Sequence, residues 1–121
     1  MADTYDITID QGATYALNVA YKDSSGTAIP LTGYSARMMV RTVVNASTTL
    51  LSLTSSAGGT GNTTGLSITA ATGLIDIVIS STDTAGLPRG NAVYDLEIVA
   101  PSGVVTRLLE GAVLVDPEVT R

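Results

Sequence analysis

TDTAGLPRGNAVYDLEI, residues 82–98, joins a turn to an alternating segment and says most about the fold. Ser81-Thr82-Asp83 can cap a short helical turn, and Leu87 can then plug the end of a hydrophobic core. Pro88 and Gly90 end that turn because neither residue continues a helix well. The next residues alternate, which places three apolar side chains on the inner face of a central strand: Tyr94, Leu96 and Ile98. We interpret the stretch as a structural corner, with a ligand-binding loop as the alternative.

Short alternating segments recur along the rest of the chain, with Gly, Ser, Asp or Pro between them. No segment keeps a 3.6-residue period, so we expect no helix longer than about two turns. The pattern predicts an all-β fold: an antiparallel two-sheet β-sandwich, immunoglobulin-like, with about eight short strands. Immunoglobulin-like domains make a similar corner, with a tyrosine just after it. The expected strands are residues 5–10, 15–21, 34–41, 48–53, 66–69, 74–80, 93–99, 104–110 and 112–115.

One hydrophobic core is expected to join the two sheets in a single domain over residues 1–121. Hydrophobic residues make up 45% of the sequence, which is enough for a core. The chain has five Tyr but no Phe or Trp, so Val, Ile, Leu, Met and Ala must supply most of the packing. The inward rows of the strands give the expected core: Tyr15, Leu17, Val19, Tyr34, Met38, Val40, Ile75, Ile77, Ile79, Tyr94, Leu96 and Ile98.

The composition argues against several classes of function. The chain has no Cys and no His, which removes disulfides, thiolate metal ligands and the commonest general base. A net charge of −5 with only six basic residues argues against nucleic-acid binding. There is neither a membrane-spanning apolar run nor a signal peptide. We therefore expect no catalytic residues, no cofactor, no metal, no nucleic acid and no membrane among the sites and partners of this chain.

Two features look like binding motifs but fit a structural role better. The segment GGTGNTTG (58–65) lacks the Lys-Ser/Thr end of a phosphate-binding loop, and no helical pattern follows it. We expect an exposed Gly-rich loop over residues 54–65, with almost nothing that could pack. Two sets of carboxylates could hold calcium, but their spacing places them on solvated outer strand faces: Asp3, Asp6 and Asp10, and Asp76, Asp95 and Glu97.

Three apolar residues on expected outer faces are candidates for contacts between subunits. Met39 interrupts an otherwise polar row between Arg37 and Arg41. Val93 and Val99 flank two carboxylates on the outer face of another strand. Isolated exposed apolar side chains are also ordinary on protein surfaces, so the alternative is that these three residues take part in no contact.

The two terminal arms are further candidates. Residues 1–4 and 116–121 are polar and carry little that could pack on their own domain. Such arms commonly become ordered only against a neighbour. The candidate subunit interface therefore contains the Gly-rich loop, the N-terminal arm and these residues: Met39, Val93, Val99, Asp116, Pro117, Glu118, Val119, Thr120 and Arg121.

A series of short segments follows a characteristic order along the chain. The order is QGAT (11–14), LTGY (31–34) leading into Arg37 and Arg41, TAGL (84–87), YDLE (94–97), Gly111 and PEVTR (117–121). In this order the segments resemble a widespread group of small phage virion proteins, which includes the N-terminal domains of baseplate upper proteins. These N-terminal domains anchor receptor-binding parts to a phage tail. The resemblance spans nearly the whole chain.

This resemblance implies a non-enzymatic structural protein of a bacteriophage virion that acts through contacts between subunits. Because no fibre or receptor-binding module follows Arg121, we expect a multicopy tail or baseplate component or an adaptor rather than the adhesin itself. A head decoration or capsid-surface protein is one alternative, and a carbohydrate-binding or adhesion module of sandwich fold is another. The implied partners are other virion proteins and further copies of this chain, and the implied location is the virion, after synthesis in the host cytoplasm.

Overall fold

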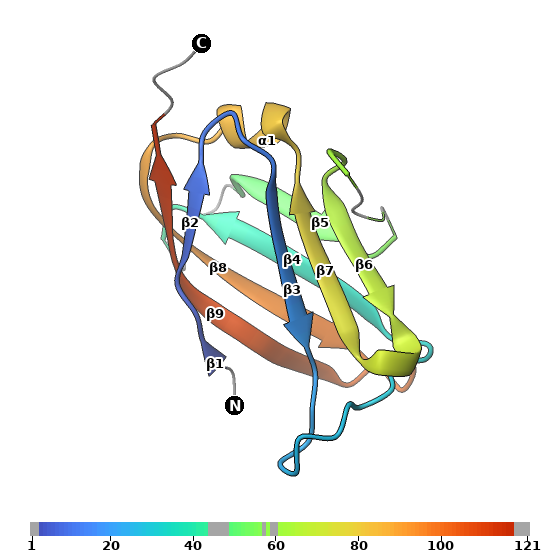
Figure 1. The fold of residues 1–121 in the computed structure, drawn as a ribbon. Helices are drawn as coiled ribbons and strands as arrows, with labels where there is room; N and C mark the ends of the chain where they lie inside the picture. The colour runs from blue at the N-terminus through green and yellow to red at the C-terminus, as the bar shows by residue number, and fades with distance from the viewer. Residues whose placement is uncertain (1–2, 44–48, 57, 59–60, 118–121) are drawn as a thin grey trace.

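The protein consists of two β-sheets packed face to face (Figure 1). The structure is a computed structural model that describes residues 3–43, 49–56, 58 and 61–117. The strands are β1 (Asp3–Thr4), β2 (Ile7–Asp10), β3 (Tyr15–Ala20), β4 (Ser35–Arg41), β5 (Leu51–Thr54), β6 (Gly65–Thr69), β7 (Leu74–Ile79), β8 (Gly90–Val99) and β9 (Val105–Asp116). The larger sheet has the order β1-β9-β8-β4-β5, with β2 also paired to β9, and the smaller sheet has the order β3-β7-β6. A 3₁₀ turn (Ala70–Thr72) precedes β7, and the short helix α1 (Ser81–Ala85) precedes β8.

The order of the strands confirms the predicted immunoglobulin-like sandwich. β9, β8, β4 and β5 correspond to strands G, F, C and C′ of that fold, and β3, β7 and β6 correspond to B, E and D. Neighbours within each group run antiparallel, as predicted. The first strands differ, because β1 and β2 run parallel to β9. β5 represents the predicted strand 48–53, of which residue 48 lies outside the described residues.

Two predictions about how the chain is divided into strands are wrong, and both concern the same edge of the larger sheet; β8 also begins at Gly90, three residues before the predicted strand. The predicted strand 5–10 begins only at Ile7, as β2, because the chain bends at residues 5–6, and the unpredicted strand β1 precedes that bend. The predicted strands 104–110 and 112–115 form the single strand β9. Gly111 does not end a strand, since it stays in register opposite Tyr94.

The core lies between the two sheets and is built from the inward rows of their strands. Eight of the residues predicted for it are buried: Met38, Val40, Ile75, Ile77, Ile79, Tyr94, Leu96 and Ile98. Four others pack against it but are only half-buried: Tyr15, Leu17, Val19 and Tyr34. Three of these four lie on β3, an edge strand of the narrower sheet, where water reaches one side of the inward row.

A short helical turn at one end of the sandwich confirms the predicted corner. α1 leads from β7 to β8, and Leu87 just after it is buried in the core. The capping residue differs from the prediction by one position. Ser80, rather than one of residues 81–83, is the N-cap, because its hydroxyl accepts a hydrogen bond from the backbone N–H of Asp83 at 3.1 Å.

The turn between β2 and β3 is bound to this corner. Thr84 is fully buried in α1, and its hydroxyl accepts a hydrogen bond from the Gly12 N–H at 3.1 Å. The same hydroxyl lies 2.9 Å from the carbonyl oxygen of Ala13, to which it can donate. Gln11 Nε2 donates to the carbonyl oxygen of Leu87 at 2.7 Å. The segments QGAT and TAGL, far apart in the sequence, therefore meet at one end of the sandwich.

Thr84→Val should lower the free energy of unfolding by about 1–3 kcal/mol, since valine keeps the shape of the side chain but leaves the Gly12 N–H without its partner. Thr82→Val is the matched control, because Thr82 is exposed on the same helical turn, and it should change stability by less than about 0.5 kcal/mol. Urea denaturation of both variants measures the difference. Equal effects would show that the Thr84 hydroxyl does not hold the turn.

The N-terminal strands cross close over β9 at Gly111. The Tyr5 N–H donates to the Glu110 carbonyl oxygen at 2.9 Å, and the Tyr94 hydroxyl donates to the Tyr5 carbonyl oxygen. A β-carbon at Gly111 would collide with the Tyr5 carbonyl oxygen and would lie 2.9 Å from Asp6 Oδ1. Glycine is therefore required at this position. The tyrosine after the corner also differs from its immunoglobulin-like counterpart, since it bonds to backbone 89 residues earlier rather than a few residues upstream.

Gly111→Ala should lower the free energy of unfolding by roughly 1–3 kcal/mol, because the added methyl group forces two closely paired backbones apart. Gly86→Ala is the control: there the nearest atom to an added β-carbon is the Asp83 carbonyl oxygen at 3.6 Å, an ordinary contact. Thermal denaturation of the two variants compares them. If they are equally stable, the crossing is not as close as described.

Candidate subunit interface

The outer face of the larger sheet carries the residues around Met39. Strand alternation explains their exposure, because the residues between them, such as Met38 and Leu96, are buried on the inner face. The register of β4 and β8 sets the outward residues in opposite pairs: Arg37 and Glu97, Met39 and Asp95, Arg41 and Val93. Met39 and Val93 therefore lie on the same part of the face, among charged side chains.

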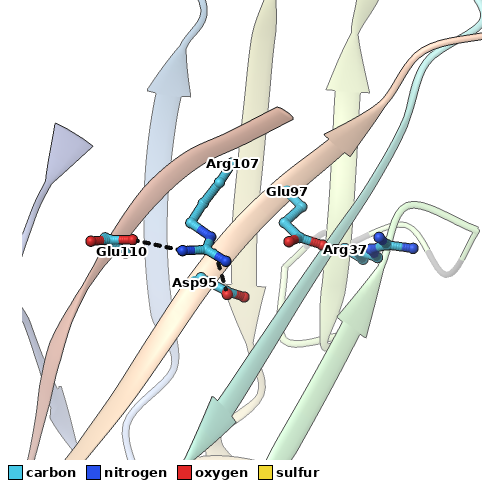
Figure 2. Close-up of polar contacts among 5 residues, drawn as sticks. All are labelled: Arg37, Asp95, Glu97, Arg107 and Glu110. Carbon is cyan, nitrogen blue, oxygen red and sulfur yellow. Dashed lines mark hydrogen bonds and ion pairs between the residues drawn. The ribbon is translucent and has the colours of Figure 1, made fainter. Parts of the chain in front are cut away.

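Three ion pairs among the described residues lie on this face (Figure 2). Arg37 Nε lies 2.8 Å from Glu97 Oε1 and joins β4 to β8. Arg107, on β9, lies 3.5 Å from Asp95 Oδ2 and 3.1 Å from Glu110 Oε1. Both arginine side chains are about half exposed, at 49% and 51%, so each pair contributes at most about 1 kcal/mol. The ion pairs therefore orient the charged side chains but add little to the stability of the fold.

Asp95 is a carboxylate whose ionised form is disfavoured in the folded chain. Partial burial is the largest cause of its raised pKa, and the negative charges of Glu97 and Glu110 add to the shift. Arg107 opposes the shift without cancelling it, at 3.5 Å from the carboxylate. The pKa of Arg107 is itself raised, first by its hydrogen bond to Glu110 and then by the charge of Asp95. Asp95 is therefore partly withdrawn from water and incompletely neutralised.

A shallow concavity of about 570 Å³ lies over β4, β8 and β9 on this face. Met39 and Val93 line it together with five charged residues: Arg41, Asp95, Glu97, Arg107 and Glu110. Met39 is 37% exposed, and its sulfur accepts a weak hydrogen bond from Arg41 Nη2 at 3.4 Å. An open depression of mixed polarity suits contact with another protein surface more than enclosure of a small ligand.

Val99 lies apart from the other two apolar candidates. It is six residues beyond Val93 on β8, roughly 20 Å along the strand. Val105 lies opposite it on β9 and is 47% exposed, and Val104 in the adjoining turn is also exposed. Val99 therefore belongs to a second apolar area at the turn between β8 and β9, not to the concavity around Met39.

Several exposed apolar side chains were not predicted from the sequence. Leu114 points outward from β9 between the buried Val113 and Val115, and alternation alone would have placed it there. Tyr5 is exposed at the crossing over β9, where the bend between β1 and β2 turns its side chain outward. No local signal in the sequence predicts that bend.

The terminal arms differ from the prediction where the structure describes them. Asp3 and Thr4 pair with β9 of the same chain, so these residues do not depend on a neighbour for their pairing. Asp116 is the last residue of β9, and its carbonyl oxygen accepts a hydrogen bond from the Gln11 N–H at 2.9 Å. Pro117 is exposed, and the other arm residues lie outside the described part of the chain: Met1, Ala2, Glu118, Val119, Thr120 and Arg121.

The Gly-rich loop is bound to α1 at its C-terminal end, contrary to the expectation that it packs against almost nothing. The Asn62 side chain accepts a hydrogen bond from the Ser81 N–H at 2.8 Å and donates one to the Ser81 hydroxyl at 3.1 Å. The Thr64 hydroxyl accepts from the Ser80 N–H at 2.8 Å and donates to Asp83. These contacts fix the end of the loop as part of the corner. Within the loop, the described residues do not include 57, 59 and 60.

The described residues contain neither a metal-binding cluster nor a helix that could span a membrane. No group of three or more acidic side chains among them is arranged to hold a metal ion. None of their helices is long and apolar enough to cross a membrane. No protein-family model matches the chain, and no curated protein is significantly similar to it.

Asp95→Asn should stabilise the protein at neutral pH, and the gain should disappear in acid. The folded-state pKa of Asp95 is raised above 3.8, so wild-type stability falls as the pH rises from 3.8 through the folded value, whereas the variant has no such loss. Melting temperatures between about pH 3 and pH 7 measure the difference. A difference that does not vary with pH would contradict the raised pKa.

Asp23→Asn is a control of opposite sign for this experiment. Hydrogen bonds from the Ser25 side chain and the Thr27 backbone lower the pKa of Asp23. This carboxylate therefore stabilises the fold above pH 3.8, and its contribution is lost as the pH falls through the lower folded value. The variant should be less stable than the wild type at neutral pH and should approach it in acid.

Proposed function

We propose that this chain is a non-enzymatic structural protein of a bacteriophage virion, present in many copies as a tail or baseplate component or adaptor. The observation that carries the proposal is the ordered set of motifs that resembles small phage virion proteins. Residues 11–14 and 84–87 of that set meet at the corner, and Gly111 and Tyr94 both lie against Tyr5 at the crossing over β9. The resembling segments are thus ones that hold this fold together, which supports a shared architecture.

The outer face of the larger sheet supports a role in contacts between subunits. No described segment forms a third layer over it. It presents Met39 among half-exposed charges, and Leu114 and Val105 on β9 are exposed elsewhere on the same sheet. A surface that is partly apolar at its centre and charged around it is typical of an interface between proteins.

The tyrosines give little support to a carbohydrate-binding module. Such a module usually presents aromatic rings on which a sugar can stack. Here Tyr94 is buried, while Tyr15, Tyr21 and Tyr34 are half-buried. Tyr5 is 48% exposed, but one exposed ring does not form a platform. We therefore favour assembly over sugar recognition.

Quantitative mass spectrometry of purified phage particles tests the proposal. The protein should be found in many copies per particle, in a fixed ratio to tail or baseplate proteins. Antibody labelling in electron micrographs then separates a tail or baseplate position from the alternative of head decoration. If the protein is absent from washed particles, it is not a virion component and the proposal is wrong.

A truncated variant extends this test to the C-terminal arm. Removing residues 118–121 should leave the melting temperature unchanged, since β9 ends at Asp116. The same change should remove the protein from particles, because the arm is proposed to bind a neighbouring subunit. Normal incorporation of the folded, truncated protein would show that the arm is not needed for assembly.

A further inference from the structure

Charges on the outer face of the larger sheet are separated by strand. The outward row of β4 holds Arg37 and Arg41 and no acidic residue, while that of β8 holds Asp95 and Glu97 and no basic residue. Met39 lies between the two arginines and is 37% exposed. The face therefore has a positive column and a negative column about 5 Å apart, with an apolar side chain at the centre.

Such a face is complementary to a copy of itself, and the charges select one orientation. A two-fold axis that runs along the strands, between β4 and β8, places the β4 of each copy over the β8 of the other. Arg37 then faces Glu97 of the second copy, and the two Met39 side chains lie near the axis. An axis across the strands would instead bring arginines over arginines and carboxylates over carboxylates, which is unfavourable.

We propose that a second copy of this chain packs on the outer face of the larger sheet, in a two-fold symmetric dimer with β4 over β8. The proposal rests on the multicopy part of the proposed function, and it identifies the surface and the partner. Two shallow concave faces leave a space between them when they meet. The long side chains of Met39, Arg41 and Arg107, which line the concavity, can fill that space from both copies.

Other occupants fit this face less well. A nucleic acid requires an excess of positive charge, but the basic and acidic residues here are equal in number: Arg37, Arg41 and Arg107, and Asp95, Glu97 and Glu110. A glycan favours exposed aromatic rings, and the tyrosine of β8, Tyr94, points inward and is buried. Balanced charge in separate columns favours a partner with the same arrangement.

The area of the face predicts a weak dimer. Four strands about 4.8 Å apart, over seven residues at about 3.3 Å each, cover roughly 440 Å². Two copies then bury roughly 900 Å², which is below the range of about 1,200–2,000 Å² that is usual for stable complexes. Such a contact forms where copies are concentrated, as in an assembled particle. It should also weaken as salt is added, because charges cross the interface.

Charge reversal followed by mixing tests this dimer. Arg37→Glu and Glu97→Arg each break the ion pair within a copy and place like charges across the axis, so neither variant alone should dimerise. An equal mixture should form a heterodimer, since the reversed charges then match between copies while the pair within each copy stays broken. Sedimentation velocity at roughly millimolar concentration measures both states. A monomeric wild type, or no recovery on mixing, would overturn the proposal.

Met39→Asp and Leu114→Asp form a matched pair for the position of the contact. Both side chains are exposed on the same sheet, but only Met39 lies at the proposed axis. Met39→Asp should raise the dimer Kd by about tenfold or more, and Leu114→Asp by less than about twofold. Equal effects would place the contact elsewhere and overturn the proposal, provided that both variants melt as folded proteins.

These outcomes are separate from the fate of the proposed function. The dimer is measured on the isolated chain, so the absence of the protein from phage particles would leave the measurement unchanged. A monomeric chain that is nevertheless found in particles would overturn the dimer and leave the virion role intact.

Discussion

The close crossing of the N-terminal strands over Gly111 determines how this sandwich is closed. The missing side chain lets the backbone of Tyr5 approach β9, and the Tyr94 hydroxyl binds the carbonyl oxygen that faces it. The first and last strands therefore share one edge of the larger sheet (Figure 1). This sheet gains two strands that the smaller sheet lacks, so β3 stays at an edge and is only half-buried. The close approach of the N-terminal segment to β9 thus depends on one glycine.

Local alternation was enough to predict much of the fold, but contacts distant in sequence were not predictable from it. The inward rows of β4, β7 and β8 read directly from the sequence, because a period of two needs no partner to be recognised. The corner was predictable from its turn residues and Leu87, to within one residue at the cap. From the sequence, Gly111 was predicted to separate two strands, whereas in the structure it leaves room for the backbone of Tyr5. That distinction depends on Tyr5, more than 100 residues earlier, and no local pattern contains it.

The candidate interface could be predicted only in part, because alternation gives the orientation of a side chain but not its neighbours on other strands. Met39 stood out because it breaks a polar row, and the structure places it on the outer face as expected. The sequence could not place it opposite Asp95, since that pairing depends on the register between strands separated by a long stretch of chain. Val99 shares the outward row of Val93 but lies at the other end of the strand. Shared orientation is thus predictable, while proximity on the surface requires the register.

Ion pairs within one copy do not prevent the same charges from pairing between copies. Each pair contributes at most about 1 kcal/mol while water solvates both partners, so Arg37 can turn from its own Glu97 to that of a second copy at little cost. Contact removes water, which strengthens matched charges and penalises unmatched ones. Asp95 already bears part of this penalty in the single chain, as its raised pKa indicates. In the proposed dimer, Met39 of the second copy lies over Asp95, and Arg37 and Arg41 of that copy lie on either side of it and add positive charge to that of Arg107. The raised pKa of Asp95 thus comes from its partial burial and from the neighbouring carboxylates of Glu97 and Glu110, and the charge columns come from the residues that face outward on β4 and β8.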